Sequence, residues 1–266
     1  MSQPVEPEFH VLPPPAIASS NHQTLLNLVI KRVGNPRMST KSPITYELFD
    51  FLTDLQINNQ RPWFSENKQR YQDQVLDPAV ELCEQLHDPL LRIAPKLVLN
   101  PKRHRGSVMR IYRDTRFSKD KRPFKTNVGI SIRHKDANEI HAPGIYLHLE
   151  PRDCFLGCGC WKPDRQSLTQ IRRSIIAQPT SWKRTINQIR SGGIFEISGD
   201  SLKRAPRDID GNHPHIEDLK RTDFILISKF TEQECVHPDF IEQVIDQIQN
   251  AKPWMRFLCK AMNLPY

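Results

Sequence analysis

Three alternating residues, Tyr146, His148 and Glu150, have the chemistry to hold or move a proton. Aliphatic residues separate them, so an extended chain would place the three together on one face of a sheet. A histidine next to a carboxylate is an arrangement that can serve as a general base, with His148 or Glu150 in that role. The spacing therefore predicts a polar, titratable face on a strand over residues 144–150.

A second group of chemically capable residues is strongly basic. Residues 101–135 hold twelve Lys or Arg and two Asp, a local charge of +10, whereas the whole chain carries +8. The remainder of the chain is slightly acidic, so the positive charge is one concentrated feature. An arginine cannot lose its charge, and guanidinium groups near a core need carboxylates, carbonyl oxygens or a bound anion as partners. The segment therefore predicts a partner that is anionic.

The residues around these arginines favour a strand over 107–117. In that strand Arg110, Tyr112, Asp114 and Arg116 would share one face. The opposite face, directed at the core, would hold the following residues: Met109, Ile111, Arg113 and Phe117.

We expect the two polar faces to meet and form one site. It would bind an anion through bidentate guanidinium contacts and exchange a proton with it. The candidate catalytic residues are His148, Glu150 and Asp114. The candidate ligand-binding residues are Arg110, Arg113, Arg116, Lys121, Lys125, Tyr146, Trp63 and Arg207. The alternative interpretation is a structural network in which Glu150 and Asp114 neutralise the arginines.

Two other functions remain open at this point. The basic segment 102–125, with aromatic residues among its cations and an overall pI near 9.2, would suit a nucleic-acid-binding protein. The other open function is that of a noncatalytic interaction domain, in which the basic segment has an architectural role. Arginines that alternate with apolar residues and accompany acids favour a confined site over an exposed nucleic-acid surface. Whether the protein is an enzyme stays open.

The basic segment also carries a resemblance. R-x-x-R-D-x-R-F-x-x-D-K-x-x-F, from Arg110 to Phe124, resembles the signature of a widespread bacterial and fungal family of conserved hypothetical proteins with a domain of unknown function. That family ends the motif in Tyr, so a role that needs a phenol at Phe124 does not carry over. The resemblance continues through further motifs at 58–64, 144–151 and 202–207. It implies one compact domain and no established activity.

The elements that would position these residues predict an α+β fold, with a central antiparallel sheet flanked by helices. Helical periodicity marks 44–57, 62–86, a helix that includes 168–175 and another over 179–189, and it predicts C-terminal helices over 238–249 and 253–262. Consecutive strands are expected at 107–117, 126–132 and 144–150, then shorter ones at 194–197 and 224–230. Residues 1–43 have the composition of a disordered extension, and 44–266 form the expected single domain.

Composition excludes several classes of protein. The sequence has no apolar run long enough for a membrane span and no apolar signal stretch, so the cytoplasm is the expected location. The six Cys are then expected to be reduced, and Cys154, Cys158 and Cys160 lack the paired spacing of a structural zinc site. No metal is predicted. Cofactor, ligand identity and oligomeric state are not indicated by the sequence.

Overall fold

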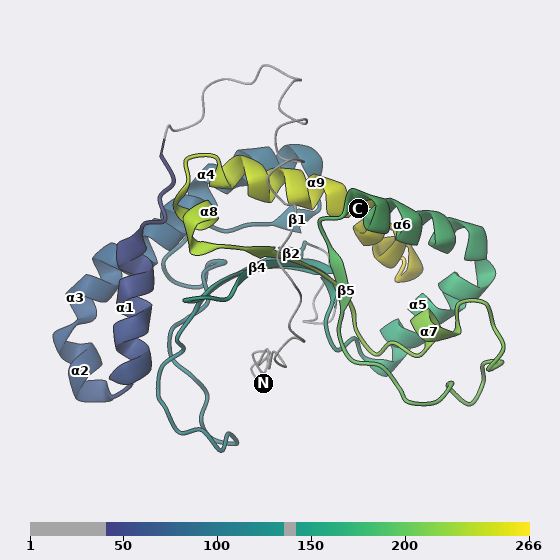
Figure 1. Ribbon diagram of the computed structural model, residues 1–266, viewed down its shortest axis with the longest axis horizontal. Coiled ribbons are helices and arrows are strands. Elements are labelled where there is room, and N and C mark those ends of the chain that lie inside the picture. The colour runs from purple at the N-terminus through teal and green to yellow at the C-terminus, as the bar shows by residue number, and fades with distance from the viewer. Residues whose placement is uncertain (1–40, 136–141) are drawn as a thin grey trace. The chain divides into compact units, whose positions relative to one another are not determined.

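The computed structural model describes residues 41–135 and 142–266 (Figure 1). The predicted N-terminal extension therefore lies, from residue 1 to residue 40, outside the described residues.

A mixed sheet-and-helix architecture, the predicted α+β class, is confirmed. In the described part of the chain a six-stranded sheet has the order β1-β2-β3-β4-β6-β5, and each neighbouring pair is antiparallel. The strands are β1 (Leu97–Val98), β2 (Val128–His134), β3 (Gly144–Leu149), β4 (Cys154–Cys160), β5 (Glu196–Ser198) and β6 (Phe224–Phe230).

Helices come before β1, between β4 and β6, and after β6. They are α1 (Tyr46–Ile57), α2 (Arg61–Glu66), α3 (Lys68–Tyr71), the π-helical turn η2 (Gln72–Leu76), α4 (Asp77–Ile93), α5 (Arg165–Ala177), α6 (Pro179–Gly192), α7 (Ile216–Leu219), α8 (Glu232–Val236) and α9 (Phe240–Ala261). Local signals set several ends. Asp164 caps α5 by accepting from the backbone N–H of Ser167, and Gly193 ends α6 in the left-handed conformation.

The two faces of the sheet differ in chemistry. On one face Ile130, Leu147 and Leu156 are in register on adjacent strands, and all three are buried. Helices α4 and α9 run along the sheet (Figure 1), and α9 contacts this face where Phe240 meets Phe230 edge to face. On the opposite face Gly129 and His148 are directly paired. The aliphatic face thus forms the core, and the other face is left for polar groups.

The prediction of a strand over 107–117 is wrong. Only isolated bridges join Val108 to Ile130 and Tyr112 to Phe124. The chain follows β2 as far as Met109, whose N–H donates to the carbonyl of Gly129, and then leaves the sheet. It folds back on itself, because Arg113 N–H donates to Pro123 O and Lys125 N–H donates to Ile111 O.

Side chains in this segment consequently do not alternate as predicted. Phe117, expected in the core, is 94% exposed. Since Val108 pairs with Ile130, strand alternation places Met109, rather than Arg110, on the face of Gly129 and His148.

Two helix predictions also need correction. The C-terminal pair is one helix, α9, with Pro253 inside it, because burial of Trp254, Met255 and Leu258 holds the helix together across a missing backbone hydrogen bond. The helix predicted over 62–86 is instead a series of segments from α2 to α4, with a break at Asn67.

The cysteines do not form a reactive or metal-binding cluster in the described residues. All six are buried and without a disulfide. Burial raises the pKa of the Cys158 and Cys160 thiols well above the ordinary value, so both are held as neutral thiols. Among the residues that the structure describes, no three His, Cys, Asp or Glu side chains are grouped to hold a metal ion. No helix in the described ranges has the length and apolar content to cross a membrane.

Candidate functional site

A chain of hydrogen bonds follows the polar face of β3. His148 Nε2 lies 3.1 Å from Glu150 Oε2, and His148 Nδ1 lies 3.2 Å from the Tyr146 hydroxyl. Asn127, immediately before β2, places Nδ2 3.3 Å from the Tyr146 hydroxyl and 3.4 Å from His148 Nδ1. We call Asn127, Tyr146, His148 and Glu150 the relay. The predicted grouping of the three β3 residues is therefore present as one connected set.

Glu150 is held by groups from two other segments. Thr126 donates its hydroxyl to Glu150 Oε1 at 2.7 Å, and Gln56, near the end of α1, donates from Nε2 at 3.3 Å. Burial raises the pKa of Glu150, but the hydrogen bonds from His148, Thr126 and Gln56 together lower it below the ordinary value. The Glu150 carboxyl is therefore ionised at neutral pH, although only 26% of its side chain is exposed.

The ionised Glu150 fixes the orientation of the imidazole. A carboxylate only accepts, so the His148 Nε2 must carry the proton of that bond. In the neutral ring Nδ1 is then the acceptor, and both the Tyr146 hydroxyl and the Asn127 amide nitrogen approach it as donors. The relay thus has a direction: Tyr146 donates to His148, and His148 donates to Glu150.

Packing fixes the two rings of the relay. The His148 ring stacks on Phe155 of β4 at 4.6 Å between centroids and 13° between planes. The Tyr146 ring lies across Gly129 of β2, where an added Cβ would come within 2.5 Å of the Tyr146 hydroxyl oxygen. A side chain at position 129 would therefore displace the Tyr146 ring, which agrees with the role of glycine inside strands at close approaches.

In the arginine loop, residues 110–125, three arginines are paired with the two aspartates of the loop. Asp114 accepts from the backbone N–H of Arg116 and takes its guanidinium bidentately, with contacts of 3.0 and 2.6 Å. Asp120 binds Arg122 in the same way and also accepts from Arg113. The repeated Asp-x-Arg spacing therefore makes two local turns that are closed by ion pairs.

These ion pairs lower the pKa values of both aspartates. The side chain of Arg116, and then its backbone N–H, lower the pKa of Asp114 to about 2. The pKa of Asp120 is also far below its ordinary value, through the side chains of Arg122 and Arg113. The hydrogen bond to Asp120 raises the pKa of Arg122 against the lowering effect of burial, and Glu150 adds a smaller contribution.

The base of the loop is anchored to the helical layer. Asn59 pairs with both backbone groups of Phe124: it donates from Nδ2 to the carbonyl oxygen and accepts from the N–H, each at 3.0 Å. The Phe124 ring stacks on Phe64 of α2 at 4.2 Å. Phe124 is 3% exposed and serves as an apolar anchor.

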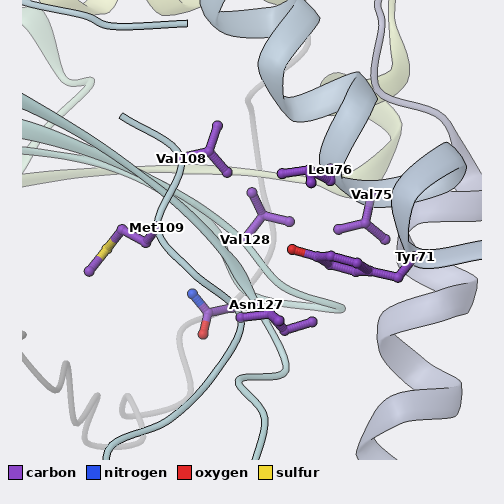
Figure 2. A pocket seen from close by; sticks show the side chains of 8 residues that line it. Tyr71, Val75, Leu76, Val108, Met109, Asn127 and Val128 are labelled. Atoms are coloured by element: carbon purple, nitrogen blue, oxygen red, sulfur yellow. The ribbon is translucent and has the colours of Figure 1, made fainter. Parts of the chain in front are cut away.

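A recess lies beside the relay, on the side of η2. It is lined by Tyr71, Val75, Leu76, Val108, Met109, Ile111, Asn127 and Val128 (Figure 2). It is open to solvent and small: its volume of about 10 Å³ is on the order of one water molecule. Figure 2 shows the Tyr71 hydroxyl directed into the recess. Burial, with a smaller effect of Tyr112, raises the pKa of Tyr71 to about 12, so its phenol stays protonated.

The structure places the remaining predicted residues in different surroundings. Arg110 and Lys125 lie at the two ends of the arginine loop, and Lys121 donates to the carbonyl of Thr115 at 2.9 Å. Trp63 is half-buried in α2 with its ring 5.7 Å from that of Phe51. Arg207 is exposed after β5, a strand separated from β3 by β4 and β6.

Sequence reasoning missed four residues that support the relay: Gln56, Thr126, Asn127 and Gly129. The glycine did give a signal, since it interrupts the strand-like run V-G-I-S-I. The other three contact β3 only after the chain has folded, and nothing in their spacing indicates this.

Residues 47–257 match the family described as conserved hypothetical protein (DUF2461). The chain belongs to this family. The matched range includes the relay, the arginine loop and all six strands of the described sheet. The predicted membership of an uncharacterised conserved family is thus confirmed. No curated protein and no solved structure matches the chain.

Proposed function

We propose that the protein binds a small anionic ligand, bearing a phosphate or a carboxylate, next to the relay and exchanges a proton with it. The observation that carries this proposal is the directed series of hydrogen bonds from Tyr146 through His148 to an ionised Glu150. A hydroxyl, a base and an oriented acid in series is the general arrangement of groups that transfer protons in active sites.

Each relay residue has a distinct role in this proposal. Tyr146 contacts the ligand through its hydroxyl. His148 accepts the hydroxyl proton at Nδ1 as the general base, and the phenolate oxygen then takes a proton from the ligand. Glu150 is a positioning residue, which keeps the Nε2 proton in place and stabilises the imidazolium that forms. Asn127 donates to the Tyr146 oxygen and so favours the phenolate that appears after proton transfer.

The arginine loop supplies long-range attraction for the anion. It carries seven Lys or Arg and two Asp, so a net positive charge remains after Asp114 and Asp120 have paired. Asp114 is occupied by Arg116, and we assign it a structural role in the loop.

A thermal-shift series with inorganic phosphate, phosphate monoesters and small carboxylates tests this function. A ligand at about 100 times its dissociation constant raises Tm by about 5 °C or more for a protein of this size. We expect such a shift in the wild type and its loss in Tyr146→Phe, which keeps the ring and removes the hydroxyl. Tyr46→Phe, an exposed tyrosine on α1, is the matched control and should respond like the wild type.

The architectural alternative predicts a different result. If no anion shifts the Tm of the wild type, and if Tyr146→Phe and His148→Asn only lower stability, the relay is a structural network. A ligand shift that survives in both variants would place the binding site elsewhere.

A further inference from the structure

The tip of the arginine loop exposes an aromatic ring. Phe117 is 94% exposed, whereas the next most exposed large apolar side chain reported in the described residues, Ile57, is 78% exposed. The guanidinium of Arg116 lies over the Phe117 ring, 5.8 Å from its centroid. An exposed flat ring with a cation against it is an arrangement that stacks well with another flat π-system.

The loop that carries this ring is internally braced. Two Asp-x-Arg turns flank the tip, and Arg113 joins the first turn region to Asp120 in the second. At the base, Tyr112 bridges to Phe124, which Asn59 and Phe64 hold against the helices. Figure 1 shows the teal loop reaching away from the sheet. The ring is therefore presented by a preorganised segment, which lowers the entropic cost of binding.

The charge around the tip indicates an anionic partner. Residues 110–125 carry seven Lys or Arg against two Asp, and both acids are already paired with arginines. Lys119, Lys121 and Arg122 are all exposed and close in sequence to Phe117. Cations placed around an aromatic ring in this way suit a polyanion in which planar rings alternate with negatively charged groups.

We propose that this loop tip binds single-stranded nucleic acid, with an unpaired base stacked on Phe117 and backbone phosphates contacted by the neighbouring cations. A base offers a π-face to the ring, and the phosphates match the positive charge. A lipid surface fits less well, because insertion of Phe117 into hydrocarbon would carry with it the Arg116–Asp114 ion pair. A duplex fits less well too, since its bases are already stacked on each other.

Fluorescence anisotropy with the full chain and a labelled thymidine strand of about 12 nucleotides tests this inference. We expect binding at about 50 mM salt that weakens steeply by about 200 mM. Phe117→Ala should weaken binding by about ten-fold and leave the salt dependence unchanged. Lys119→Gln should reduce the slope of log affinity against log salt by about 0.7. Ile57→Ala and Lys183→Gln, exposed residues outside the loop, are the matched controls and should bind like the wild type.

Three outcomes would overturn the inference. The first is no binding of the strand at low salt, and the second is equal binding by Phe117→Ala. The third is a preference for duplex, or for anionic phosphatidylserine vesicles that Phe117→Ala abolishes. The inference is independent of the relay: His148→Asn should bind the strand like the wild type, so failure of the ligand hypothesis and failure of this one are distinguishable.

Discussion

The relay and the arginine loop are both clusters of charged and polar side chains, but they are built in opposite ways. In the loop, each aspartate binds the arginine two residues later, so the pairs are local and exposed. In the relay, Glu150 gathers donors from α1, from the segment before β2 and from β3 itself. His148 is 6% exposed, whereas Arg116 has 77% of its side chain exposed.

The difference indicates which cluster has the properties of a site for proton transfer. Local ion pairs on a surface form whenever the chain turns there, and they add little to stability. Groups collected from distant segments around one buried imidazole need the whole fold in place, and such clusters are where proton chemistry is found. The arginines that dominate the sequence are thus mostly engaged with their neighbours, and the less conspicuous residues of β3 form the candidate site.

The largest expected effect tests how the loop is anchored. Asn59→Ala removes the partner of both buried backbone groups of Phe124 and should lower the free energy of unfolding by about 2–4 kcal/mol. Asn58→Ala is the matched control: its side chain only donates to the Asp54 carbonyl at the end of α1, so we expect a loss below about 1 kcal/mol. Urea denaturation measures both. Equal losses would mean that the Asn59 contacts do not anchor the loop.

A second variant disturbs the packing of Tyr146 against β2. Gly129→Ala brings a Cβ within 2.5 Å of the Tyr146 hydroxyl oxygen, and overpacking of this kind costs about 1–3 kcal/mol. Gly192→Ala, at the end of α6 with nothing within 4 Å of its added Cβ, should be neutral or slightly stabilising. Denaturation curves compare the stabilities of the two variants, and near-ultraviolet circular dichroism reports the packing of the tyrosines. A Gly129→Ala protein as stable as the wild type would show that Tyr146 does not lie across β2.

Acid should affect the relay in a defined direction. The pKa of Glu150 is below its ordinary value of 4.5 in the folded protein, so its contribution to stability is complete above that pH and is lost as pH falls through the lower folded value. We expect the wild-type Tm to fall as the pH is lowered below about 4.5 and the fall to be shallower in Glu150→Gln. Asp88→Asn, a carboxyl with 81% of its side chain exposed, is the control. Identical slopes in all three proteins would contradict a hydrogen-bonded, ionised Glu150.

The smallest effect separates the two kinds of arginine within the loop. Arg113 has 18% of its side chain exposed and reaches across the loop to Asp120, so Arg113→Gln should lower the urea midpoint. Arg116 is largely exposed, and its ion pair is with the nearby Asp114, so Arg116→Gln should leave the midpoint unchanged. The opposite order would mean that the local turns, rather than the cross-loop pair, brace the segment.

Local sequence patterns predicted much of the fold. Strand β6 was predicted with its observed bounds and β3 to within one residue, because both alternate or run apolar between clear turn signals. The helices α5 and α6 followed from their apolar spacing and from Pro179 at the start of α6. The titratable face of β3 was predicted for the same reason: alternation alone decides which side chains share a face.

The failures come from interactions that alternation does not represent. The run from Ser107 to Phe117 looks like a strand by composition, but Asp114 and Asp120 turn the chain by binding backbone N–H groups two residues later. Pro253 reads as a helix boundary, yet tertiary packing keeps α9 continuous. The supports of the relay, Gln56, Thr126 and Asn127, come from segments whose proximity depends on the folded sheet and its helices.

The most direct test of the account is the tautomer of His148, observed in a two-bond ¹H–¹⁵N correlation spectrum of the imidazoles and assigned with His148→Asn. At neutral pH we predict that Nε2 carries the proton and that Nδ1 is the acceptor, and that Glu150→Gln loses this strong preference. A proton on Nδ1 in the wild type, or a spectrum that Glu150→Gln leaves unchanged, would contradict a relay directed from Tyr146 through His148 to Glu150.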